Sequence, residues 1–168
     1  VAVGSILYFT ATDTDHGNEL WSASDSAAPA IVKDIDPGEK LVNGNSVKRG
    51  SFPANLINVG GSLYFTAINV RDTQFIDARE LTLFRIPSNS TIPTAIQVLN
   101  LRFTDGPYYL QTVATSNTLF LLIPGSGGSL TLWQSYFVTN GTTTSEEFQV
   151  VSITDRVPLE NVVNPKNL

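Results

Sequence analysis

The feature that most constrains this sequence is an internal repeat with a period of 56 residues. Residues 3–11 and 59–67 are identical at seven of nine aligned positions, and a further step of 56 reaches residues 115–123. Identity has faded in this third copy, but a polar turn again precedes a bulky apolar strand. Equal spacing found twice is typical of repeat architectures, in which each copy is one supersecondary unit.

Each copy continues in the same order. A second strand follows the first, then a turn rich in Ser, Asn, Pro or Gly, then a third strand, and a Pro-led segment enters the next copy. Helical periodicity is not sustained anywhere, and the β-branched and aromatic content suits strands. We therefore predict an all-β fold of three four-stranded antiparallel, blade-like repeats.

The predicted organisation is a single repeat domain over residues 1–168. The repeats cover approximately residues 3–52, 53–106 and 107–156, and residues 157–168 form a spare strand or tail. Loops account for the length of the period, above all at residues 36–51 and 69–79. The shared period also predicts that three leucines occupy equivalent buried positions: Leu7, Leu63 and Leu119.

Three short segments carry a resemblance to a known family. Residues 19–21 read Glu-Leu-Trp, residues 32–35 read Val-Lys-Asp-Ile, and residues 60–65 read Gly-Gly-Ser-Leu-Tyr-Phe. Together with Leu7-Tyr8-Phe9, they resemble the bacterial ELWxxDGT repeat family, in which a Gly-Gly-x-Leu-Tyr-Phe strand is followed by Glu-Leu-Trp, an Asp-Gly-Thr turn and Val-Lys-Asp-Ile. The resemblance covers residues 3–67, although Asp25-Ser26-Ala27 stands in place of the Asp-Gly-Thr turn. The resemblance implies β-propeller blades on a large secreted or cell-surface protein, without catalytic residues.

Three blades are fewer than the four to eight of a closed propeller. The chain is a piece of a longer propeller, or two copies form a six-bladed ring, or three sheets form a β-prism or trefoil-like lectin. Only residues 1–3 precede the first turn, whereas residues 158–163 are a spare strand. We predict that the chain is not a self-sufficient monomer and that the spare strand adds to residues 6–11, with contacts from Pro158, Val162 and Val163.

Composition narrows the possible partners. The net charge is −5, and the 10 Lys and Arg residues do not cluster, which argues against a nucleic-acid partner. The longest apolar stretch, residues 119–123, is too short to span a membrane. Cys is absent, so disulfides, thiolate nucleophiles and Cys-based metal sites are excluded. Met is also absent, so we expect a processed product or part of a longer protein.

The segment from Asp13 to Glu19 contains the strongest candidate functional site in the sequence. Its alternating carboxylates, glycine and downstream Glu resemble the first half of a calcium loop, with Asp13, Asp15, Asn18 and Glu19 as ligands. The full twelve-residue spacing of that loop is lacking, and the same residue types suit a plain hairpin turn, which we favour. We expect that folding does not require calcium, and no other cofactor is indicated. His16, the only histidine, lacks a Ser or Cys partner signature, so no catalytic residue is predicted.

Aromatic residues recur at matched places in the copies. Lectins present rings in this way to sugars, but blade-to-blade packing needs the same recurrence and is the favoured interpretation. One residue of the pair Tyr108 and Tyr109 must face outward in a strand, so this pair is a candidate contact. Two sequons make Asn89 and Asn140 candidate glycosylation sites, but a composition rich in Ser, Thr and Asn also yields such triplets by chance, which is the favoured interpretation. The matched rings are Tyr8, Tyr64 and Phe120, and again Trp21, Phe84 and Trp133.

The sequence therefore favours a non-enzymatic function. We expect an extracellular or cell-surface module for adhesion, protein–protein interaction or assembly, with other copies or other protein chains as partners. The alternative is a carbohydrate-binding lectin. The fold alone assigns no reaction, because sites on such folds are carried by loops.

Overall fold

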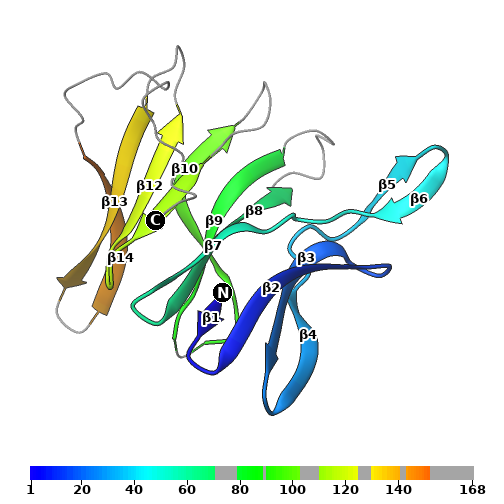
Figure 1. Ribbon diagram of the computed structural model, residues 1–168. Helices are drawn as coiled ribbons and strands as arrows, with labels where there is room; N and C mark the ends of the chain where they lie inside the picture. The colour runs from blue at the N-terminus through cyan, green and yellow to red at the C-terminus, as the bar shows by residue number, and fades with distance from the viewer. Residues whose placement is uncertain (71–78, 89, 103–109, 125–129, 141–142, 152–168) are drawn as a thin grey trace, which may run out of the picture. The chain divides into compact units, whose positions relative to one another are not determined.

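The computed structural model describes residues 1–70, 79–88, 90–102, 110–124, 130–140 and 143–151 (Figure 1). These residues form strands and turns and no helix, which confirms the all-β prediction. The chain divides into two compact units, Val1–Gly106 and Pro107–Leu168. The division falls at the predicted boundary between the second and third repeats.

The first unit contains two four-stranded antiparallel sheets. The first sheet has the order β1-β2-β3-β4, and the second has the order β10-β9-β8-β7. In the first sheet the strands are β1 (Ala2–Val3), β2 (Ile6–Asp13), β3 (Gly17–Ser24) and β4 (Ala27–Lys33). In the second they are β7 (Ala54–Val59), β8 (Ser62–Val70), β9 (Arg79–Ile86) and β10 (Thr94–Arg102).

The second unit contains the third sheet, which is again antiparallel, with the order β11-β12-β13-β14. Its strands are β11 (Gln111–Ala114), β12 (Leu119–Pro124), β13 (Leu130–Asn140) and β14 (Thr143–Val151). No sheet of the described residues closes into a barrel, since each has two edge strands. The arrangement of the sheets as propeller blades stays a prediction.

The strand register preserves the period of the sequence. Phe9 lies opposite Trp21, Phe65 lies opposite Phe84, and Leu121 lies opposite Trp133. The first residues of these three pairs are 56 positions apart along the chain. The three sheets therefore place corresponding residues at corresponding points of their second and third strands.

The core of the first unit lies between its two sheets. Tyr8 and Leu20 from the first sheet share a buried cluster with the ring pair Phe65 and Phe84 of the second sheet, whose centroids are 5.3 Å apart. The rings are stacked with an interplanar angle of 14°. The remaining buried members of the cluster are Ile35, Leu63, Ala67 and Ile86.

The prediction of three equivalent buried leucines is wrong for Leu7. Leu63 and Leu119 are fully buried, but the Leu7 side chain is 49% exposed. Side chains alternate between the faces of a strand, so Tyr8 points to the core and Leu7 points to the opposite face. In the first sheet this opposite face is not covered by the described residues of its unit, whereas both faces of the second sheet are buried.

The predicted loop at residues 36–51 contains a hairpin instead. Strands β5 (Glu39–Val42) and β6 (Asn45–Lys48) pair in antiparallel fashion, and the hairpin stands out from the first unit in cyan in Figure 1. Asn43 and Gly44 form its two-residue turn with φ angles of 52° and 80°. Positive φ at both positions is the geometry of a type I′ turn, which matches the twist of the two strands.

Candidate functional site

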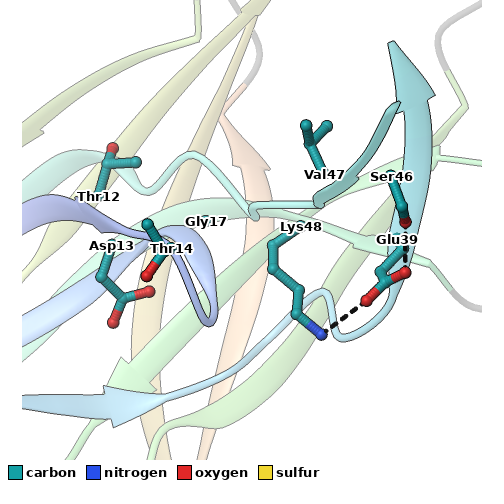
Figure 2. Close-up of a pocket in the computed structure, with 8 residues that line it drawn as sticks. All are labelled: Thr12, Asp13, Thr14, Gly17, Glu39, Ser46, Val47 and Lys48. Atoms are coloured by element: carbon teal, nitrogen blue, oxygen red, sulfur yellow. Dashed lines mark hydrogen bonds and ion pairs between the residues drawn. The ribbon is translucent and has the colours of Figure 1, made fainter. Parts of the chain in front are cut away.

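The tip of the β5–β6 hairpin carries exposed apolar side chains. Leu41 is 78% exposed, Val42 43% and Val47 37%. Near the base, Lys48 Nζ lies 3.0 Å from Glu39 Oε1, and the Ser46 hydroxyl donates to the same carboxylate (Figure 2). The Ser46 hydrogen bond, followed by Lys48, holds the pKa of Glu39 below its usual value. These cross-strand contacts fix the register of the hairpin below its apolar tip.

Arg49 stabilises the base of the hairpin through hydrogen bonds and an ion pair. Its backbone N–H donates to Gly38 O at 3.0 Å, and its Nη2 donates to Pro37 O at 2.8 Å. Its Nε lies 3.4 Å from Oδ1 of Asp36, whose side chain is fully buried. Arg49 thus joins the entry and exit of the hairpin through both its backbone and its side chain.

Glu19, predicted as a calcium ligand, instead holds the segments on either side of the hairpin. Its buried carboxylate accepts hydrogen bonds from the Ser51 hydroxyl at 2.5 Å and from the Ser51 N–H at 2.9 Å. The N–H groups of Ile35 and Asp36 donate to it at 3.3 and 3.5 Å. Burial raises the pKa of Glu19, and these hydrogen bonds oppose that rise. Both chain segments that flank the hairpin therefore meet on one carboxylate.

Two glycines let the backbone after the hairpin lie directly against the start of β3. A Cβ atom on Gly17 would fall 2.1 Å from Arg49 O, and one on Gly50 would fall 2.4 Å from Asn18 N. The Phe52 N–H donates to Asn18 O at 3.2 Å beside them. No side chain larger than hydrogen fits at either position without moving backbone, so the contact depends on glycine.

A pocket with a cavity volume of about 480 Å³ lies between the tip of the β2–β3 hairpin and the β5–β6 hairpin (Figure 2). Its charged groups are Asp13, Glu39 and Lys48, of which Glu39 and Lys48 pair with each other. The other lining residues are Thr12, Thr14, Gly17, Ser46 and Val47. This mixed lining suits hydrogen bonding to a polar group of a partner.

The four predicted calcium ligands do not converge. Asp13 accepts from the N–H groups of Asp15 and His16 at 3.0 and 2.6 Å, and its Oδ2 lies 2.8 Å from His16 Nδ1. Asn18 donates to the Thr12 hydroxyl, and Glu19 is committed to Ser51. Among the described residues no three His, Asp or Glu side chains gather as a metal site would require. A calcium site at this loop stays a prediction.

The Asp13–His16 contact lies within the turn between β2 and β3. The hydrogen bond that the His16 ring donates to the Asp13 carboxylate raises the pKa of His16 and lowers the pKa of Asp13. Neither group has a nucleophilic Ser beside it in the contacts that the structure describes. The arrangement caps the turn that leads from β2 into β3.

Several predicted site residues cannot be placed in this description. Asn140 ends β13, and its side chain lies outside the described residues. Also outside them are Tyr108, Tyr109, Asn89, Pro158, Val162 and Val163. The anchoring roles of Arg49, Ser51 and Glu19 were not anticipated from the sequence. The hairpin itself had a signal, Asn43-Gly44 between apolar residues, which is the strongest short-range mark of a two-residue turn.

The described residues form an all-β structure whose β5–β6 hairpin is anchored at its base and exposes three apolar side chains. Comparisons of the chain with protein-family models, with curated proteins and with solved structures found no match. Within the residues that the structure describes, no helix has the length and apolarity needed to cross a membrane.

Proposed function

We propose that this chain is a non-enzymatic protein-interaction module of propeller-like blades that acts in adhesion or assembly. The observation that carries the proposal is the β5–β6 hairpin, which is fastened at its base and exposes Leu41, Val42 and Val47 near its tip. The resemblance to the ELWxxDGT family supports an extracellular or cell-surface location.

The anchoring of the hairpin favours recognition over a passive loop. An isolated two-stranded hairpin is only marginally stable in water, so this one depends on the contacts of Arg49 and Glu19. Binding to an element that is already ordered costs less conformational entropy than binding to a flexible loop, which must become ordered in the complex. Apolar side chains at the centre of such a contact contribute most of its binding free energy.

Blade-like stacking is supported by the pattern of the matched aromatic residues. Of the matched rings, Tyr8, Tyr64 and Phe84 are buried, and Phe84 stacks on Phe65, whereas Trp21, Phe120 and Trp133 are half-buried. A buried ring cannot stack on a sugar. Because half of the set is committed to the interior, we favour a protein-binding module over a lectin, whose sugar contacts would need rings at the surface.

The proposal is tested by measuring the binding of the full chain to a panel of purified extracellular proteins and, in parallel, to a glycan array. We expect protein binding that Leu41→Lys weakens about tenfold or more, as loss of a central apolar contact does. Ile92→Lys is the matched control, because Ile92 is also exposed (67%) but lies away from the hairpin. Glycan binding with no protein binding, or equal binding by the Leu41→Lys variant, would contradict the proposal.

A further inference from the structure

We infer that the outer face of the first sheet docks on the outer face of the third sheet in a second copy of this chain. The inference goes beyond the proposed function, because it names two surfaces other than the hairpin and the partner that they bind. Leu7, Phe9 and Trp21 belong to the first surface, here called the head face. Val113, Phe120 and Leu122 belong to the second, here called the tail face.

The contact between the first two sheets supplies the template. In the first unit, the Tyr8 and Leu20 side of the first sheet packs on the Phe65 and Phe84 side of the second sheet. Phe65 and Phe84 form a cross-strand pair in the second sheet, and Phe9 and Trp21 form the corresponding pair in the first sheet. The head face of the first sheet therefore corresponds to a surface that another sheet of the same kind covers in the second.

Burial confirms that the head face lacks this cover. Leu63 and Phe65 are both fully buried in the second sheet. Leu7, the counterpart of Leu63, is 49% exposed, and Phe9 and Trp21 are only half-buried. The two copies have nearly the same local sequence, so the difference lies in what covers them.

The third sheet presents the opposite kind of surface. Leu119, Leu121 and Ile123 point to one side and are buried, as are their counterparts in the second sheet. On the other side, Val113 is 60% exposed and lies opposite Phe120, which is half-buried together with Leu122. Phe120 is the counterpart of Tyr8, whose side of the first sheet does the covering in the template contact.

The head and tail faces are thus the two halves of one recurring contact. Two copies that each carry one head face and one tail face pair head to tail. Such a heterologous contact closes into a ring when the rotation permits and otherwise extends as a filament. Open apolar surfaces of this kind are uncommon on soluble monomers.

The test measures self-association of the full chain and its variants by sedimentation over a wide range of concentrations. Leu7→Lys blocks the head face, and Val113→Lys blocks the tail face; both replace exposed residues, and thermal unfolding checks that each variant folds. We expect wild type to self-associate beyond 18.2 kDa. Each variant alone should associate about tenfold or more weakly, since each loses one half of every contact.

Mixing the two variants provides the decisive result. Each retains the half that the other lacks, so we expect a 1:1 dimer that grows no further. A monomeric wild type, a Val113→Lys variant that associates normally, or a mixture that stays monomeric would overturn the inference. Leu41→Lys should self-associate like wild type. If it does not, the hairpin is the self-contact, which overturns this inference while leaving a protein-binding function in place.

Discussion

Glu19 is the residue on which the base of the hairpin depends, because one buried carboxylate receives hydrogen bonds from both flanking segments. Burial raises its pKa in the folded state above the ordinary value of 4.5. The folded chain therefore holds this proton more tightly than the unfolded chain does. The contribution of Glu19 to the free energy of unfolding is fully present below the unfolded pKa and declines as pH rises through the folded pKa.

We expect the Glu19→Gln variant to lose this decline. The free energy of unfolding is measured with denaturant at a series of pH values for wild type and variant. The difference between the two should change from pH 4.5 upward until the pKa of Glu19 in the folded state has been passed. Asp25→Asn, in the exposed turn between β3 and β4, is the control and should retain the wild-type slope. Parallel curves for wild type and the Glu19→Gln variant would contradict this account of Glu19.

His16 reports on the β2–β3 turn because it is the only histidine. The Asp13 hydrogen bond raises its pKa above 6.5, so NMR titration of the ring should give a midpoint above that value. In an Asp13→Asn variant the midpoint should fall, since the charge and the charge-assisted hydrogen bond are both removed. An unchanged midpoint would mean that the pair does not form in solution.

At the scale of elements, the contact between the hairpin base and β3 makes a sharp prediction about glycine. Gly17 and Gly44 both have positive φ, at 74° and 80°, but only Gly17 faces a backbone atom within reach of an added Cβ. Gly44→Ala should cost about 1–2 kcal/mol, the strain of a left-handed residue. Gly17→Ala adds the clash with Arg49 O and should cost clearly more, about 3 kcal/mol or above, in denaturant unfolding. Equal losses of unfolding free energy in the two variants would show that the backbone at the base of the hairpin moves to accommodate the added Cβ atom.

Strands β2 and β8 are equivalent in the two sheets of the first unit, but the Leu7 side of β2 is exposed whereas the Leu63 side of β8 is buried. Leu63→Ala should destabilise the chain by about 2–5 kcal/mol, because it opens a cavity in the core. Leu7→Ala, at the corresponding position, should cost about 1 kcal/mol or less, since the side chain is half in water. Both are measured by denaturant unfolding at low concentration, where copies are apart. A large cost at Leu7 under those conditions would contradict an uncovered head face.

This pair also shows what the sequence could and could not predict. Alternation and the repeat predicted the strands and the matching of Trp21 with Phe84, because both are local properties of a pleated chain. Exposure of Leu7 was not predictable, because residues 7–11 and 63–67 are identical and only their tertiary neighbours differ. The role of Glu19 was missed for the same reason, since its partner Ser51 lies in a distant segment.

At the scale of the whole molecule, the three sheets differ in which of their sides are buried. The first sheet buries its Tyr8 side, the second buries both sides, and the third buries its Leu121 side. The first sheet leaves its Leu7 side open, and the third sheet leaves its Val113 side open. These two surfaces, the head face and the tail face, are the ones that we propose for contact between copies.

Quenching of Trp21 fluorescence by acrylamide tests that claim most directly. The chain has only two tryptophans, so a Trp133→Phe variant leaves Trp21, on the head face, as the single reporter. We expect Trp21, whose side chain is half-buried and whose indole Nε1 is buried, to be partly accessible to acrylamide in dilute protein. This partial access should fall as the concentration rises and copies associate. Protection that does not change while the sedimenting mass increases would contradict it, because the contact would then lie elsewhere.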